Sequence, residues 1–289
     1  IMGFLMIGML SIMLPRADVA AQRIDEVLEC KPSIADPDPG KAKDALLGAN
    51  GLPGARIAFE NVSFRYSDGA ECVLEDVSFT CEPGKTTAII GSTGSGKSTV
   101  LKLAERFHVS QHALRTQLGY VPQAAFLFSG TIASNVGYGV DDADEDRIRA
   151  AADVAQASDF IAERPEGLAT PISQGGTNVS GGQRQRLAIA RALATDARAY
   201  LFDDSFSALD YKTDAALRHE LSSRLGGKTV VIVAQRISTV LNADQIVVLD
   251  DGRVVGAGTH EQLMESCQEY REIAMSQLSE DELKGGDAR

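Results

Sequence analysis

The feature that most constrains the fold is a glycine-rich loop at Gly91–Ser98, which reads Gly-Ser-Thr-Gly-Ser-Gly-Lys-Ser. It follows a short apolar run at Thr86–Ile90 and leads into a helical stretch at Ser98–Arg106. Glycines let the backbone wrap closely around an anion, and the positive end of the following helix faces the same position. The spacing G-x-x-x-x-G-K-[ST] between a strand and a helix therefore predicts a phosphate-binding loop.

Two side chains of this loop are expected to contact a bound nucleotide directly. Lys97 should reach the β- and γ-phosphates, and the Ser98 hydroxyl should ligate Mg²⁺. The metal also needs a carboxylate, and the apolar run Ala199–Phe202 ends in Asp203. A strand that ends in Asp is common by itself, but beside the loop it predicts ATP and Mg²⁺ as cofactors.

Further apolar runs indicate an α/β fold. Continuous runs at Thr229–Ala234 and Gln245–Leu249 are typical of parallel strands that are covered on both faces. Alternating runs at Arg56–Arg65 and Val73–Thr80 are typical of half-buried antiparallel strands. The sequence therefore predicts a parallel sheet with an antiparallel β-ribbon beside it.

The first residues differ in character from the rest. Ile1–Leu14 carries no charge, and as a helix it would reach about 21 Å, against about 30 Å of bilayer hydrocarbon. Taken alone, it is either the end of a membrane helix or a buried helix. Pro15-Arg16 closes this run, and Ala17–Cys30 has the spacing of an amphipathic helix. Lys31–Gly54, rich in Pro and Gly, is expected to be a linker.

Charge and cysteine usage exclude some classes of function. The formal net charge is −12, and non-specific nucleic-acid binding needs basic surface, so we expect no nucleic-acid partner. None of the four cysteines forms a Cys-x-x-Cys pair, which favours reduced thiols over a zinc or redox site.

A second motif makes the pattern more specific. Val179–Arg186 reads Val-Ser-Gly-Gly-Gln-Arg-Gln-Arg and lies just upstream of the strand that ends in Asp203. With the phosphate loop, these residues resemble the nucleotide-binding domain of ATP-binding cassette (ABC) transporters of the exporter type. The resemblance runs from about Arg56 to Tyr270, and Ile1–Glu29 resembles the end of an exporter's last membrane helix.

The resemblance implies a P-loop NTPase core with a parallel sheet, an antiparallel β-subdomain and a helical subdomain. It divides the chain into the end of the last transmembrane helix with its cytoplasmic extension (1–30), a linker (31–54) and the nucleotide-binding domain (55–289). The helical subdomain would span about 124–180. The family implies ATP hydrolysis coupled to transport, with this domain on the cytoplasmic side of the cell membrane and attached to its own transmembrane domain.

The resemblance also assigns roles to single residues. Tyr66 resembles the aromatic residue that stacks on adenine, and Gln123 resembles the glutamine that contacts Mg²⁺ and reports to the membrane domain. Ser207–Asp210 is similar to the loop that crosses between paired domains. The signature Ser180–Gln183 would cap ATP held by a second, head-to-tail subunit, so each site would need two chains. Candidate nucleotide ligands are Tyr66, Gly91, Ser92, Thr93, Gly94, Ser95, Gly96, Lys97, Ser98, Thr99, Ser180, Gly181, Gly182 and Gln183. Candidate magnesium ligands are Ser98, Gln123 and Asp203.

The catalytic candidates are Gln123 and two further residues whose types differ from those usual in the family. Where the family has Glu to polarise the attacking water, this chain has Asp204, which is one methylene shorter, and a misplacement of about 1 Å can cost on the order of 10²-fold. Where the family has His, this chain has Gln235, whose neutral amide can hydrogen-bond phosphate but cannot take up a proton or carry a positive charge at neutral pH. The pair resembles the degenerate half of heterodimeric exporters, whose partner is a different half-transporter with Glu and His in place.

Other readings of the sequence stay open. The chain could belong to a homodimeric exporter with slow hydrolysis, to a soluble ABC ATPase, or to a nucleotide-sensing module that never hydrolyses. The family usually has a strand–turn–strand segment where Arg106-Phe107-His108 here runs almost directly into Val109, so that segment is either deleted or omitted. The transported substrate is not indicated, because exporters contact it through their membrane helices.

Overall fold

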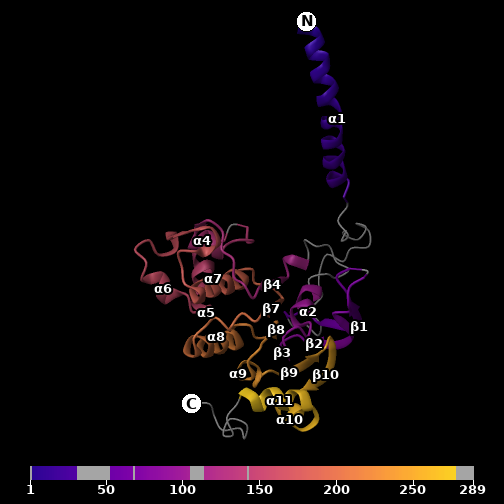
Figure 1. Cartoon of the computed structure of the whole chain (residues 1–289). Helices are drawn as coiled ribbons and strands as arrows, with labels where there is room; N and C mark the ends of the chain where they lie inside the picture. The colour runs from indigo at the N-terminus through magenta and orange to yellow at the C-terminus, as the bar shows by residue number, and fades with distance from the viewer. Residues whose placement is uncertain (1, 31–52, 68, 105–113, 142, 278–289) are drawn as a thin grey trace. The chain divides into compact units, whose positions relative to one another are not determined.

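The computed structural model describes residues 2–30, 53–67, 69–104, 114–141 and 143–277 (Figure 1). Most of the expected linker, the abrupt junction after His108 and the polar tail Ser279–Arg289 lie outside these residues. The chain forms two compact units, Ile1–Ala42 and Lys43–Arg289.

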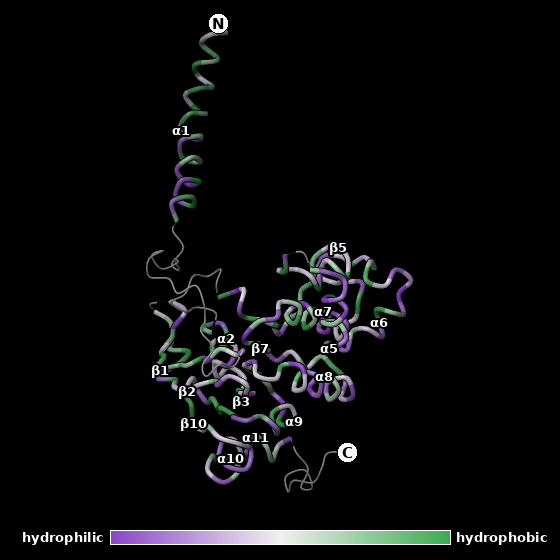
Figure 2. Tube along the Cα trace, turned by 180° about the vertical axis from the view of Figure 1, so that it is seen from behind, coloured by the Kyte–Doolittle hydropathy of each residue, from purple (hydrophilic) through white to green (hydrophobic). Residues whose placement is uncertain are grey.

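In the described residues of the first unit, the chain forms one helix, α1 (Met2–Leu28), of 27 residues. It is long and apolar enough to cross a membrane, by length and composition, and at about 1.5 Å per residue it reaches about 40 Å. Pro15 lies inside it, so the apolar run and the amphipathic stretch form one helix, with the charged residues in its second half (Figure 2). No residue of α1 is buried within the chain, and the helix is consistent with the end of a membrane helix.

A six-stranded sheet forms the centre of the second unit, in the order β10-β9-β3-β8-β7-β4. Its strands are β3 (Thr86–Gly91), β4 (Leu118–Val121), β7 (Ala199–Asp203), β8 (Thr229–Val233), β9 (Gln245–Asp250) and β10 (Arg253–Gly258). All of them pair in parallel except β10, which is antiparallel to β9. β7 and β8 are buried at every position, as the continuous apolar runs predicted.

The predicted antiparallel ribbon is also confirmed. It consists of β1 (Ile57–Phe64) and β2 (Leu74–Cys81), which pair antiparallel. Phe59 and Phe79 are partners in the ladder, and their rings stack with centroids 4.6 Å apart. This ribbon shares one buried cluster with β3, α2 (Lys97–Ala104) and the β7–β9 strands, so the antiparallel layer packs on the helix that follows the phosphate loop.

A helical lobe lies beside the sheet, within the second unit (Figure 1). It contains α4 (Ile132–Val136), α5 (Glu145–Val154), α6 (Ser158–Ala162) and α7 (Gly181–Ala194), with 3₁₀ turns η2 (Gly167–Ala169) and η3 (Gln174–Gly176). The lobe also has a short antiparallel ribbon, β5 (Gly130–Thr131) with β6 (Pro171–Ile172), which the sequence did not indicate. The remaining helices among the described residues are α8 (Tyr211–Arg224), α9 (Ile237–Val240), α10 (His260–Ser266) and α11 (Gln268–Gln277).

Candidate functional site

The glycine-rich loop connects the end of β3 to the start of α2, as the motif predicted. Two glycines of this loop lie very close to neighbouring strands. A Cβ on Gly91 (φ +157°) would lie 2.0 Å from the carbonyl oxygen of Leu249, and one on Gly96 (φ +94°) would lie 2.6 Å from a methyl carbon of Leu74. The backbone contact at Gly91 excludes a side chain, and the positive φ of Gly96 would strain any residue but glycine, so both glycines let the loop pass close to β9 and β2.

Lys97 lies folded into this loop. Its side chain is buried, and Nζ donates hydrogen bonds to the carbonyl oxygens of Gly91 (2.9 Å) and Ser92 (2.6 Å). Burial lowers the pKa of Lys97 because desolvation disfavours its charged form, while the carboxylates of Asp204 and Asp203 oppose the shift. The loop therefore holds a partly desolvated ammonium group where the motif places phosphate.

Ser98 and Asp203 meet across 105 positions of sequence. The Ser98 hydroxyl donates to Oδ1 of Asp203 at 2.8 Å, and the Tyr120 hydroxyl donates to Oδ2 at 3.4 Å. Among the residues that the structure describes, no group of three or more His, Cys, Asp or Glu gathers. Mg²⁺ usually keeps several waters and takes one or two carboxylates, so this sparse set of hard oxygens fits it. The sequence did not single out Tyr120 as a partner of Asp203.

The three catalytic candidates converge on one carboxylate oxygen. Oδ2 of Asp204 accepts hydrogen bonds from Nε2 of Gln235 (2.8 Å) and Nε2 of Gln123 (3.1 Å). Asp204 directly follows β7 at a positive φ of 46°, with its N–H bonded to the carbonyl of Val233. Two neutral amides from different loops thus hold this carboxylate. Burial raises the pKa of Asp204, and the hydrogen bond from Gln123 opposes that rise.

We expect Asp204→Asn to stabilise the folded domain at pH 7. Because the pKa of Asp204 is higher in the folded chain, its ionised form costs stability that is regained as the pH falls below that pKa. Asn removes the charge, can accept from the same amides and tolerates positive φ. A gain of about 1 kcal/mol would raise the melting temperature at pH 7 by about 2–4 °C.

Thermal unfolding at pH 7 and pH 4 measures this effect, and the exposed Asp141→Asn is the matched control. A gain that is the same at both pH values would contradict the assignment to the charge of Asp204.

These groups surround one cavity of about 270 Å³. Its lining residues are Val73, Thr93, Gly94, Gly96, Lys97, Ser98, Thr99, Gln123, Asp203, Asp204, Val233 and Gln235. Tyr66 is 61% exposed beside it, with its hydroxyl 3.2 Å from Oγ1 of Thr99 and its ring edge-on to Phe64. Most of the predicted loop, metal and catalytic residues therefore come together at the carboxyl end of the parallel strands.

The signature residues are not brought to this cavity. Ser180 caps α7: its hydroxyl accepts from the N–H of Gln183 (3.2 Å), and the Gln183 side chain accepts from the N–H of Ser180 (3.1 Å). A Cβ on Gly182 would lie 3.4 Å from the carbonyl oxygen of Ala208, so the signature packs on the segment Ser207–Asp210. None of Ser180–Gln183 lines the cavity described above.

This fold and site define a P-loop nucleotide-binding domain, and comparisons with known proteins specify its family. Residues 74–207 match the family model described as ABC transporter. An uncharacterized ABC transporter ATP-binding protein of Mycobacterium tuberculosis is 43% identical over 298 residues, covering 96% of this chain and 50% of that protein. An ATP-dependent lipid A-core flippase of Saccharophagus degradans is 40% identical over 276 residues, covering 90% of this chain and 45% of that protein.

A solved structure is similar over the same extent. The structure of a bacterial Atm1-family ABC exporter with ATP bound matches 95% of this chain and 50% of that chain, with a TM-score of 0.86 and 33% sequence identity. The chain therefore belongs to the ABC transporter family, as a nucleotide-binding domain of the exporter type. It spans about half the length of the curated relatives it matches.

The alignment with the Mycobacterium tuberculosis protein is longer than this chain. Its 298 aligned positions outnumber the 289 residues of this chain, so that relative has residues within the aligned region that this chain lacks.

Proposed function

We propose that this chain is the cytoplasmic ATPase part of a membrane exporter and that its own nucleotide site hydrolyses ATP slowly. ATP would lie along the loop Gly91–Thr99, with adenine against Tyr66. Ser98, Asp203 and Gln123 would hold Mg²⁺, which would offset the negative charge of the phosphates. The apolar helix α1 supports attachment to the membrane, because its length and composition suit a bilayer.

The observation that carries the slow-site proposal is the pair of hydrogen bonds on Oδ2 of Asp204. A general base needs a free lone pair within reach of the water that it activates. Here Gln123 and Gln235 both bond Oδ2, which leaves Oδ1 as the oxygen that can accept a proton from water, on a side chain one methylene shorter than Glu. A Gln at position 235 also cannot supply a positive charge near the γ-phosphate.

The position of the signature supports completion of a second site in trans. The 14-residue helix α7 begins at Gly181 behind the Ser180 cap, so its N-terminus offers backbone N–H groups to an anion. None of Ser180–Gln183 lines the cavity of its own chain. We propose that the signature Ser180–Gln183 caps ATP bound to a partner half-transporter. This partner would be a different chain that carries the catalytic Glu and His.

Restoring the family residues tests the slow site. In the assembled transporter, Asp204→Glu with Gln235→His should raise turnover at this site by about tenfold or more, because displacement of a catalytic group by about 1 Å can cost on the order of 10²-fold. Single-turnover hydrolysis is measured with the partner's catalytic Glu replaced by Gln, so that the ATP hydrolysed comes from the site of this chain. Asp204→Asn with the native Gln235 is the control.

Each outcome has a defined meaning. Unchanged single-site turnover, together with unchanged asymmetry of nucleotide trapping, would contradict the slow-site proposal. Fast turnover of the unaltered chain as a homodimer would instead contradict the need for a different partner.

A further inference from the structure

The loop that carries Gln235 is held by a side chain from the far end of the sequence. The side-chain amide of Gln277, the last residue of α11, donates from Nε2 to the carbonyl oxygen of Gln235 at 2.9 Å. Its Oε1 accepts from the N–H of Ile237, also at 2.9 Å. One amide group thus bonds the backbone on both sides of Arg236.

This contact replaces a missing helix cap. Ile237 is the first residue of the four-residue helix α9, and Arg236 at its N-cap makes no side-chain capping bond. The first N–H groups of a helix have no partner inside the helix, so another group must satisfy them. Gln277 fills this role from 40 positions away. Tyr270 and Ala274 are fully buried and anchor α11 in the core that it shares with α9 and β9.

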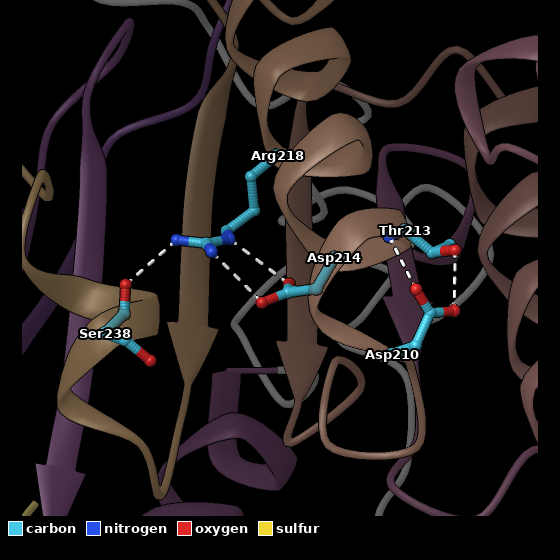
Figure 3. A network of polar contacts seen from close by, with 5 residues as sticks. All are labelled: Asp210, Thr213, Asp214, Arg218 and Ser238. Atoms are coloured by element: carbon cyan, nitrogen blue, oxygen red, sulfur yellow. Dashed lines mark hydrogen bonds and ion pairs between the residues drawn. The ribbon is translucent and has the colours of Figure 1, made fainter. Parts of the chain in front are cut away.

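A second side chain bonds the backbone of α9 one residue after Ile237. Arg218 of α8 donates from Nη1 to the carbonyl oxygen of Ser238 at 2.9 Å. Its other nitrogens form two bonds to the Asp214 carboxylate (3.2 and 3.0 Å), as Figure 3 shows. Asp214 is itself buried, so the guanidinium group has a fixed orientation. Gln277 and Arg218 thus bond the backbone at Gln235, Ile237 and Ser238, in the segment that follows β8.

We infer that Gln277 is a positioning residue for the nucleotide site, which holds the Gln235 loop so that the Gln235 amide reaches the Asp204 side of the cavity. Gln235 bonds Asp204 at 2.8 Å, and both line the cavity. The inference rests on the proposed function only in that Gln235 faces the γ-phosphate. It makes the end of α11 a determinant of how the site distinguishes ATP from ADP, because ADP lacks that phosphate.

Nucleotide affinity of the 289-residue chain in detergent tests this inference, with MgATP and MgADP titrated separately. Gln277→Ala should weaken MgATP binding about three- to tenfold and leave MgADP binding unchanged, since a hydrogen bond of ordinary strength is lost. Gln277→Glu keeps an acceptor for the N–H of Ile237 but cannot donate to the carbonyl of Gln235. It should therefore lower the preference for ATP over ADP by the same factor as Gln277→Ala. Gln268→Ala is the matched control, because that amide of α11 contacts only Glu272 among the bonds that the structure describes.

A double-mutant cycle separates positioning from general stability. In a Gln235→Ala background, Gln277→Ala should have no further effect on the ATP-to-ADP preference. Suppose that Gln235→Ala abolishes the preference for ATP over ADP while Gln277→Ala retains it. The positioning role of Gln277 is then overturned, and the proposed nucleotide site stands. If the unaltered chain shows no MgATP binding, the proposed function fails first.

Discussion

Replacing Lys97 by Met should weaken ATP binding by about 100-fold or more. Loss of one partner of a desolvated charge pair costs about 2–5 kcal/mol or more, and about 1.4 kcal/mol corresponds to a tenfold change. Nζ of Lys97 lies buried within the loop, and the residue lines the cavity. Met has a similar length and no charge, so the fold should tolerate it while the electrostatic contact with phosphate is lost.

Titration calorimetry of the 289-residue chain with MgATP measures this effect. Lys102→Met is the matched control, because Lys102 lies in the last turn of the same helix and is exposed. Its affinity should match that of the unaltered chain. Binding by Lys97→Met within threefold of the unaltered chain, with both proteins folded by circular dichroism, would contradict placement of the phosphates on this loop.

Gly181→Glu should lower ATP turnover of the assembled transporter by about 100-fold or more, without weakening ATP binding to this chain alone. The N-terminus of α7 favours an anion, and under the proposed trans arrangement a carboxylate placed there would repel the phosphates of ATP bound to the partner, at a cost of several kcal/mol. The substitution suits the local structure: a Cβ at Gly181 has only Arg184 within 4 Å, at 3.9 Å. An acidic residue in the first turn also stabilises a helix.

Gly181→Ala separates charge from size in this experiment. It fills the same space without a charge, so it should retain most of the turnover. Equal turnover for Gly181→Ala and Gly181→Glu would contradict an anion at this helix end. Weaker ATP binding by the isolated Gly181→Glu chain would instead show that the signature contributes to its own site, against the trans arrangement.

The amino-acid sequence by itself determined the parts of this protein that depend on local pattern. The spacing of Gly91, Gly96 and Lys97 between a strand and a helix specifies the phosphate loop, because close approach there admits only glycine. Continuous apolar runs indicated β7 and β8, which are buried at every position. The four-residue strand β4 was missed, because it is too short to show a period and contains Gly119.

Long-range contacts could not be predicted, because periodicity says which face is buried and not which residues meet. Only the tertiary structure decided that Gln123 and Gln235, on separate loops, both bond one oxygen of Asp204. It alone decided that Gln277 replaces the missing cap of α9. Side-chain hydrogen bonds of this kind depend on angles and on distances of about 3 Å, which are set when the sheet and helices pack.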